Sequence, residues 1–383
     1  MTEVDLYNLS PTLRLLGMGV LIALLPLVWT LYRHRHNPVN SKLRAMTVLT
    51  LFLTFDLVLF GSFTRLTDSG LGCPDWPGCY GSASPIGAVA QIDAAQTAMP
   101  TGPVTHNKAW IEMIHRYLAM AVGFLILVLA LSSTWQRWKG QFSFNGAWQV
   151  KPFWAWLTLL WVCMQGAFGA LTVTLKLSPA IVTLHLLGGI GLLVLLSAQV
   201  AWKPASQRQT IGKFHRQLIW AAAVFLTLQI AFGAWVSTNY AVLACTGFPD
   251  CNGQWWPAWN LQGFEIWRSL GMDSKGQYLP MEALVSIHFV HRLMALFVFS
   301  FAAIMLWQFK KSDILPGLTR VLFTLLTLQL ITGLSNVVLD WPLLAAVAHT
   351  GGAGALMMTL TYMLSRSKIQ KMIMNNFLRR PAA

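Results

Sequence analysis

Charged residues are scarce in this chain of 383 residues. Asp, Glu, Lys and Arg together make up 10% of it, and only 13 residues are acidic. An ordinary soluble domain is roughly 25% charged, so the composition excludes that class of protein. Apolar residues make up 55% of the chain. This balance predicts a polytopic membrane protein, in which most of the surface faces lipid.

Long apolar runs set the number of membrane spans. A helix needs about 20 residues to cross the hydrocarbon layer, and helices satisfy the backbone of such runs in lipid. Nine runs are long enough: 13–32, 45–65, 110–132, 152–174, 180–201, 217–237, 283–308, 318–338 and 342–364. The first run lacks the basic flank and the small-residue cleavage site of a signal peptide, so we expect it to remain as an uncleaved helix.

The basic residues predict the orientation of these spans. Five segments hold 19 of the 27 Lys and Arg residues: 33–44, 133–151, 202–216, 309–320 and 365–383. Short cytoplasmic loops retain positive charge, so these segments and the C-terminus are expected in the cytoplasm. The N-terminus and the long loops 66–109 and 238–282 are then outside. The net charge of +14 is therefore a topology signal with some attraction to lipid head groups, and it does not indicate a nucleic-acid partner.

Cysteine is also rare, and four of the five cysteines form a pattern. Cys73 and Cys79 are six residues apart in the first outer loop, and Cys245 and Cys251 repeat that step in the second. An oxidising outer compartment permits disulfides in these loops. Cys163 lies within an apolar run, and we expect it to be a small buried residue.

The cysteine pairs are part of an internal repeat. The second pair follows the first by 172 positions, and the pair His291-Arg292 follows His115-Arg116 by 176. His349 follows His185 by 164 positions. Landmarks in the same order predict two four-helix units, and an even number of helices gives both units the same orientation. The expected fold is all-α, with four-helix units at 43–205 and 206–383 and an extra N-terminal helix and linker at 1–42.

Four histidines stand inside the outer ends of apolar helices, two in each unit: His115, His185, His291 and His349. An ionisable residue at that depth is by default a functional candidate. Two imidazoles that face each other across a four-helix bundle suit an iron porphyrin. Zinc would require four ligands at each site, which the apolar helices do not offer. A histidine that merely bonds a neighbouring helix is the simpler alternative at any single position.

Residues beside these histidines strengthen the cofactor hypothesis. Glycines follow the second histidine of each unit, at 188 and 189 and at 351, 352 and 354, where they would admit a flat cofactor or allow close helix packing. Arg116 and Arg292 could pair with haem propionates, or they could be anchors at the membrane surface.

The two units differ three residues before their first histidine, where Glu112 precedes His115 and His288 precedes His291. That spacing places both side chains on one helix face. A carboxylate beside one site and an imidazole beside the other favours proton-coupled chemistry at the first site. A structural pairing of Glu112 with Lys108 or Arg116 is the alternative, and neither His288 nor His106 is assigned a role.

Together these residues resemble the haem A synthases of the cytochrome oxidase assembly pathway. The stretch GSFTRLTDSGLGCPDWPGCYG at 61–81 resembles the hallmark of that family, as do Glu112-x-x-His115-Arg116 and HFVHR at 288–292. The resemblance covers about residues 43–364, and it departs from the eight-helix pattern of the family in the extra helix at 13–32.

The resemblance implies specific roles for the residues. His115 and His185 would ligate the substrate haem O, His291 and His349 would ligate a haem B, and Glu112 would act at the reacting methyl. The reaction would oxidise the C8 methyl of haem O to a formyl group and so produce haem A. The cysteine pairs would be disulfides or redox-active thiols. Expected partners are haem O, a haem O synthase, membrane lipids and a quinone or other redox partner, and the expected location is a bacterial inner membrane.

Two other functions fit part of the pattern. A non-catalytic membrane electron carrier with two haem B groups would use the same four histidines but gives no reason for Glu112. A transporter with a parallel repeat would place its polar residues near the bilayer midplane, whereas the ionisable residues here gather at the outer helix ends, with Asp56 as the exception.

Overall fold

The computed structural model describes residues 10–140 and 151–369. Within these ranges the chain forms ten α-helices: α1 (Ser10–Arg33), α2 (Val39–Leu66), α3 (Val89–Ala98), α4 (His106–Trp138), α5 (Pro152–Thr174), α6 (Pro179–Ala201), α7 (Lys213–Thr238), α8 (Met281–Lys311), α9 (Pro316–Val338) and α10 (Leu343–Arg366). All except α3 are long and apolar enough to span a membrane. The predicted all-α polytopic fold is confirmed, and the chain is an integral membrane protein.

Proline and a polar cap help to define where the spans begin. Pro152, Pro179 and Pro316 are the first residues of α5, α6 and α9, where the missing N–H of proline costs no hydrogen bond. Helix α4 begins after Thr105, whose hydroxyl accepts a hydrogen bond from the Lys108 backbone N–H at 3.4 Å. Helix α5 matches its apolar run, and most of the other spans extend theirs, by up to six residues in α2 and α4. Amphipathic residues at the bilayer surface continue these helices.

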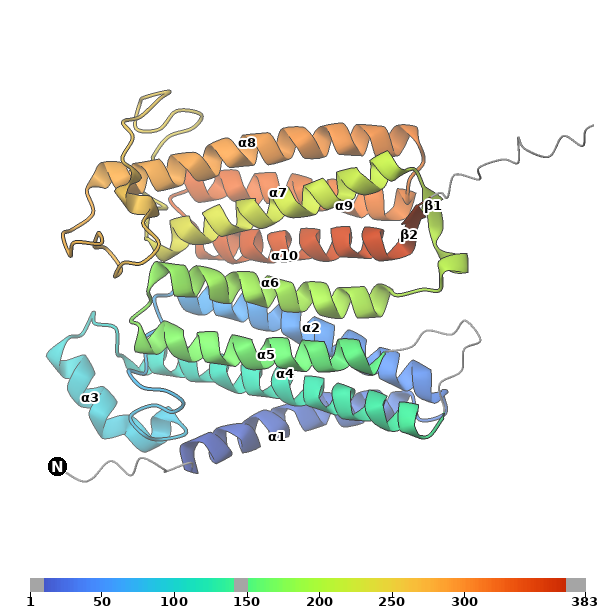
Figure 1. Ribbon diagram of the computed structural model, residues 1–383. Coiled ribbons are helices and arrows are strands. Elements are labelled where there is room, and N and C mark those ends of the chain that lie inside the picture. The colour runs from blue at the N-terminus through green and yellow to red at the C-terminus, as the bar shows by residue number, and fades with distance from the viewer. Residues whose placement is uncertain (1–9, 141–150, 370–383) are drawn as a thin grey trace, which may run out of the picture.

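The spanning helices pack as two groups of four (Figure 1). In the first group α2 contacts α4 and α6, and α5 contacts the same two helices, so α4 and α6 are diagonal. In the second group α7 contacts α8 and α10, and α9 contacts the same two, so α8 and α10 are diagonal. The groups meet where α10 packs on α2 and α6 and where α6 packs on α7. This arrangement agrees with two four-helix units, whose boundaries at 43–205 and 206–383 stay a prediction.

Helix α1 lies outside the first group, against α4 and α2. Its approach to α4 is close, because a Cβ at Gly19 would lie 2.4 Å from the Met120 Cβ. Leu15 is fully buried in a cluster with Cys73, Cys79 and Met113. The extra helix therefore supports the helix that carries His115 and the first cysteine loop.

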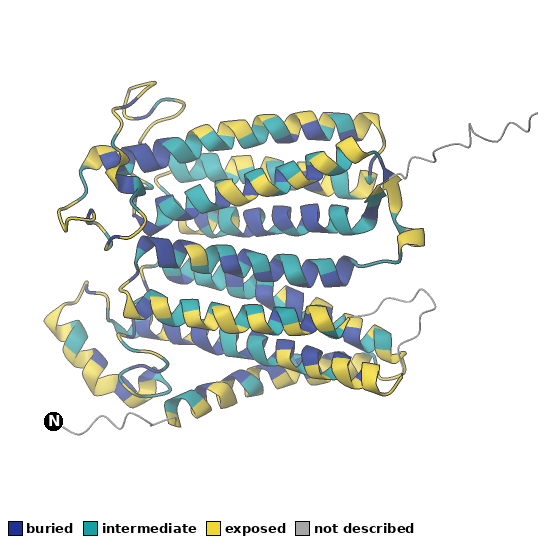
Figure 2. Ribbon diagram, in the orientation of Figure 1, coloured by how far each residue is buried: buried dark blue, intermediate teal, exposed yellow. Residues whose placement is uncertain are grey.

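Burial follows the position of each helix in the assembly (Figure 2). The inner helix α6 has half of its most apolar window buried, whereas α5 and α9 have 11% each. Outward faces of apolar helices need no protein cover in lipid. The prediction that Cys163 is buried was wrong: it is a free, exposed cysteine on α5. Its helix lies at the periphery, where a small apolar residue can face lipid as readily as protein.

The two ends of the bundle differ (Figure 1). The long loops carry the 3₁₀ helices η1 (Pro85–Ala88) and η3 (Leu261–Phe264) and helix α3, and they lie at one end. At the other end, 3₁₀ helix η2 (Ala205–Gln207) precedes strand β1 (Gln209–Ile211), which pairs in parallel with β2 (Ser367–Ile369) through Gln209↔Ser367. The sequence reasoning missed α3 and both strands, since each is short and the strand pairing joins segments far apart in the chain.

Candidate functional site

The four intramembrane histidines lie on the two diagonals of the bundle. His115 on α4 and His185 on α6 are close enough to interact electrostatically, and so are His291 on α8 and His349 on α10. Each side chain as a whole is only half-buried. The structure therefore brings the predicted residues together as one pair in each unit.

Each of these imidazoles packs against a glycine of the neighbouring helix. A Cβ at Gly61 on α2 would lie 2.9 Å from the His115 Cε1, and one at Gly233 on α7 would lie 2.9 Å from the His291 Cε1. The second histidines are placed in the same way. A Cβ at Gly169 on α5 would lie 3.5 Å from the His185 Cε1, and one at Gly333 on α9 would lie 3.0 Å from the His349 Cε1.

These four glycines occupy repeat-equivalent positions. Gly233 follows Gly61 by 172 residues, and Gly333 follows Gly169 by 164. The sequence reasoning missed them, although their recurrence at the offsets of the cysteines and the second histidines was a usable signal. A methyl group at Gly61, Gly233 or Gly333 would crowd the ring, so the absent side chain preserves the place of the imidazole there, whereas a methyl group at Gly169 would make an ordinary contact with His185.

The glycines that the sequence reasoning did single out have a packing role. A Cβ at Gly188 would lie 1.7 Å from the Gln165 side chain, and one at Gly352 would lie 2.3 Å from Gln329. A Cβ at Gly351 would lie 2.4 Å from Leu59. These glycines admit side chains of neighbouring helices, which matches the close-packing alternative.

The residues fit a pair of iron porphyrins. The Nδ1 atoms of His115 and His185 are buried and have no hydrogen-bond partner among the described residues, and a buried polar atom without a partner is rare without a functional reason. Imidazole is a usual axial ligand of haem iron. Residues 10–140 and 151–369 contain no group of three or more His, Cys, Asp or Glu side chains that could hold a metal ion, which argues against a zinc site built from these donors.

Glu112 is buried near the start of α4 and is held from two sides. Its Oε2 accepts a hydrogen bond from the Cys73 backbone N–H at 2.7 Å, and its Oε1 accepts one from the Arg116 guanidinium. Only 4% of Glu112 and 8% of Arg116 is exposed. Of the two partners considered for Glu112, the structure shows Arg116. Lys108 instead pairs with Asp68 at 3.2 Å.

Arg116 also fastens the first cysteine loop to α4. Its Nη1 donates to the carbonyls of Asp75, Pro77 and Gly78, at 3.0, 3.2 and 2.5 Å. All three carbonyls lie within the ring that Cys73 and Cys79 close. The guanidinium is thus the centre of a clamp that joins Glu112, the helix and the loop.

The second unit repeats the clamp with a different anchor. Arg292 donates to the carbonyls of Cys245, Gly247 and Asp250, at 2.5, 2.9 and 2.9 Å. Its Nε lies 3.4 Å from His288 Nε2. His288 therefore occupies the place of Glu112, as its spacing from His291 predicts. Pairing of either arginine with a propionate stays a prediction.

Both cysteine pairs form disulfides, as the loop positions allow. Cys73 and Cys79 have Cα atoms 4.9 Å apart, and Cys245 and Cys251 have Cα atoms 5.0 Å apart. Three of the four cysteines are fully buried, and Cys245 is 1% exposed. The prediction of disulfides in both loops is confirmed.

A polar cluster joins the units at the same end. The Arg65 side chain donates to the Ser237 carbonyl at 2.5 Å and lies 4.1 Å over the Tyr240 ring. The Tyr240 hydroxyl donates to Asp68. Burial is the main cause that raises the pKa of Tyr240, and the Asp68 carboxylate adds to it, whereas Arg65 opposes the shift. The cluster couples the end of α2 to the end of α7, which are the helices that carry Gly61 and Gly233.

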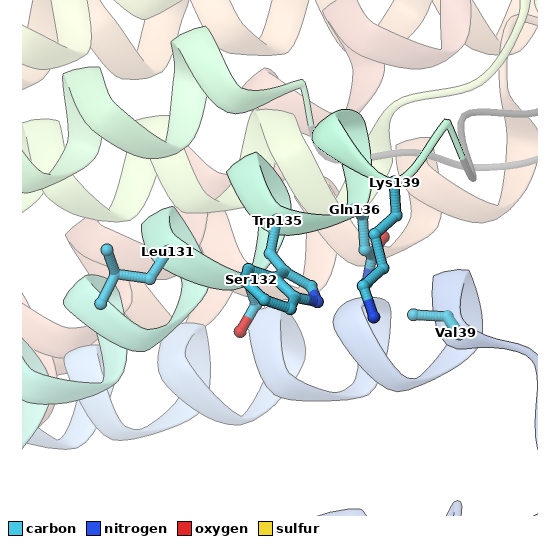
Figure 3. Close-up of a pocket in the computed structure, with 6 residues that line it drawn as sticks. All are labelled: Val39, Leu131, Ser132, Trp135, Gln136 and Lys139. Atoms are coloured by element: carbon cyan, nitrogen blue, oxygen red, sulfur yellow. The ribbon is translucent and has the colours of Figure 1, made fainter.

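Other features lie outside this site. His106 is at the start of α4 and pairs with Asp93 of α3, 2.6 Å away. A pocket of about 510 Å³ opens at the opposite end of α4, against the start of α2 (Figure 3). It is lined by Val39, Leu131, Ser132, Trp135, Gln136 and Lys139. None of the intramembrane histidines lines this pocket.

Comparison with known proteins agrees with this geometry. A family model described as "Cytochrome oxidase assembly protein" matches residues 44–361. "Heme A synthase" of Shewanella oneidensis is 36% identical over 316 residues, which cover 82% of this chain and 92% of the relative. "Heme A synthase" of Halalkalibacterium halodurans is 27% identical over 342 residues, which cover 86% of this chain and 99% of the relative. The chain therefore belongs to the haem A synthase family of cytochrome oxidase assembly proteins and is a membrane-bound oxidoreductase of haem A biosynthesis.

Proposed function

We propose that the chain oxidises the C8 methyl of haem O to a formyl group, which yields haem A. The substrate haem O would bind between His115 and His185, and a haem B would bind between His291 and His349. Two successive hydroxylations of the methyl would give a diol that loses water to form the aldehyde. In each hydroxylation a C–H bond would be replaced by a C–O bond with oxygen from water, and two electrons and two protons would be released, the electrons to the external acceptor named below.

One observation carries this proposal, namely the duplicated pair of histidines on diagonal helices. Each imidazole packs against a glycine at a repeat-equivalent position. At His115 and His291 the packing is so close that a Cβ on the glycine would lie 2.9 Å from the ring Cε1. Bundle cores commonly hold cofactors between facing helices. Two equivalent sites in one membrane protein suit a reaction in which one haem is changed and another assists. Haem B, when bound, would supply one-electron chemistry, which side chains alone do not perform.

Glu112 distinguishes the two sites. It lies one helical turn before His115, and its carboxylate is held by the Cys73 backbone N–H and by Arg116. Oxidation of a methyl group releases protons, and a carboxylate next to the substrate ligand can accept one. At the equivalent place His288 contacts Arg292, so the second site lacks this carboxylate. We assign substrate oxidation to the first unit for this reason.

The disulfides have a structural role in this proposal. The Cys73–Cys79 disulfide is fully buried, and Arg116 binds the carbonyls of the loop that it closes. A thiol exchange partner needs access to the sulfur, which burial opposes. The disulfide would keep the loop in the shape that orients Arg116 and Glu112.

The orientation in the membrane follows from the basic segments. The described parts of these segments lie at the end of the bundle where β1 and β2 lie (Figure 1), and the positive-inside rule assigns that end to the cytoplasm. Both cysteine loops and all four histidines would then lie at the outer side of a bacterial inner membrane, with the N-terminus outside. Electrons taken from the substrate would leave to a quinone or another redox partner, and a haem O synthase in the same membrane would supply haem O.

The test is expression in a host that makes haem B and haem O but no haem A. Extracted haems would be identified by chromatography and mass. The wild-type chain is expected to yield haem A or its hydroxylated intermediate, and Glu112→Gln is expected to reduce both while haem B is retained. Glu282→Gln is the matched control, because Glu282 is an exposed carboxylate in the first turn of α8. Haem B alone from the folded wild-type chain, with haem O present in the membrane, would refute the proposal and support the electron carrier.

A further inference from the structure

The four histidines differ in what contacts their Nδ1 atoms. His349 Nδ1 lies 3.0 Å from the Thr332 hydroxyl oxygen on α9. His291 Nδ1 lies 3.1 Å from the Gln229 side-chain nitrogen. In the first unit the Nδ1 atoms of His115 and His185 are buried, and no described residue bonds either one. The two units therefore differ in their support of the histidines, as well as in Glu112.

The other contacts of the Thr332 hydroxyl determine which partner donates in its hydrogen bond with His349. Its hydroxyl oxygen also lies 2.9 Å from the Leu328 carbonyl and 3.2 Å from the Gln329 carbonyl. Carbonyl oxygens only accept hydrogen bonds, so the single hydroxyl proton is directed to them. The hydroxyl oxygen is then free to accept from the His349 Nδ1–H. In that tautomer His349 Nε2 carries a lone pair that can bind a metal. This atom lies 3.4 Å from the Gln329 side-chain nitrogen, and a bound metal would replace that contact.

The equivalent residue of the first unit cannot make this contact. Subtraction of the 164-residue offset from Thr332 gives Phe168, which has no hydroxyl. The alignment is secure here, because Gly333 corresponds to Gly169 and Gln329 corresponds to Gln165 at the same offset. Both glutamines also pack against equivalent glycines, at 188 and 352. The hydroxyl is thus a local difference within an otherwise repeated site.

We propose that Thr332 is a positioning residue that holds His349 ready for a permanently bound haem, and that Phe168 leaves His185 free to turn so that its haem can exchange. This inference rests on the assignment of haem to both units under Proposed function. A hydrogen bond to the second nitrogen of a ligating histidine fixes its tautomer and orientation and raises its basicity. A resident cofactor benefits from such support, whereas a site that must release its product does not.

Retention of haem is the measurement that tests the role of Thr332. The chain would be purified from a host that makes haem B but no haem O, and loss of haem to excess apomyoglobin would be followed by absorbance. The His349→Ala variant identifies the kinetic phase that belongs to the second unit. Thr332→Val, which removes only the hydroxyl function at nearly constant volume, is expected to accelerate that phase on the order of 10- to 100-fold. Thr332→Ser is expected to restore the slow rate.

Thr327→Val is the matched control. Thr327 is on the same helix, its hydroxyl donates to the Phe323 carbonyl at 3.1 Å, and it is exposed. This variant loses the same kind of hydroxyl without a contact to histidine, so its rate is expected to equal that of the wild type. Redox titration gives a second readout: loss of the bond lowers the basicity of His349, so the midpoint potential of the second haem rises in Thr332→Val only.

The possible outcomes separate this inference from the function on which it rests. If His349→Ala leaves the haem content unchanged, the proposed haem site in the second unit is wrong. If His349→Ala abolishes binding but Thr332→Val matches Thr327→Val in rate and potential, the role of Thr332 alone is refuted. In a host that also makes haem O, Phe168→Thr is expected to slow haem loss from the first unit, and an unchanged rate would overturn the exchange half of the proposal.

Discussion

A single methyl group placed at Gly61 should affect the proposed haem site of the first unit and leave that of the second unit unchanged. The Cβ of alanine at this position would lie 2.9 Å from the His115 Cε1. Carbon atoms in favourable contact are roughly 3.5–4.0 Å apart, so the imidazole must retreat by about 0.6 Å or rotate. Gly233→Ala would impose the same displacement on His291 in the second unit.

The size of the effect follows from this displacement. Overpacking of a well-packed site costs about 1–3 kcal/mol, and a misplacement of about 1 Å at a reacting group can cost on the order of 100-fold in rate. We therefore expect Gly61→Ala to reduce haem A formation by roughly 10-fold and to lower the substrate haem that copurifies, with haem B retained. Gly233→Ala should lower the haem B content instead.

The assay is haem extraction and quantification from the purified variants, with thermal unfolding measured in parallel. Gly166→Ala on α5 is the control, because a Cβ there meets nothing within 4 Å and alanine favours a helix over glycine by up to about 1 kcal/mol. Equal haem composition in Gly61→Ala and Gly166→Ala would refute the claim that these glycines preserve the place of the imidazoles.

Two further predictions concern the end of the bundle that carries the cysteine loops. The double variant Cys73→Ser/Cys79→Ser should lower the free energy of unfolding by about 2 kcal/mol from loop entropy. It should still produce haem A, at a reduced rate because the loop that orients Arg116 and Glu112 loosens; complete loss of product with an intact fold would instead indicate redox-active cysteines. Burial raises the pKa of Tyr240 above its usual value near 10, so the folded state favours the neutral phenol. Its contribution to stability is present below that pH and lost as the pH rises through the folded-state pKa. The thermal midpoint of the wild type should fall more steeply above pH 10 than that of Tyr240→Phe, and parallel curves would contradict this account.

Much of the architecture follows from sequence because lipid imposes local requirements. Each span must satisfy its own backbone, so an apolar run of the right length is already a helix. The expected runs at 180–201 and 318–338 therefore agree with α6 and α9 to within two residues at either end. The short helix α3 lies outside these runs, and no equivalent rule identifies it.

Some of the candidate site residues could also be predicted from local sequence patterns. Spacings within one helix, such as Glu112 to His115, place side chains on one face without any knowledge of the fold. The internal repeat identified both histidine pairs, because equivalent positions of the two units carry the same residue. Periodicity says nothing about partners on another segment. Arg116, rather than Lys108, bonds to Glu112. The first cysteine loop folds back over α4, where its backbone binds both Glu112 and Arg116 and so holds the two side chains together.

The sequence by itself determined which segments cross the membrane, the repeat that relates them and the identity of the histidines. Only the tertiary structure decided which glycine faces which imidazole, that the Thr332 hydroxyl contacts His349, and that Cys163 is exposed on the surface of the bundle. Hydrophobic patterns and turn residues act over short stretches of the chain, so the segments they define can be predicted from the sequence. Contacts between diagonal and neighbouring helices depend on how all of the side chains between them pack, and that packing is a property of the folded assembly.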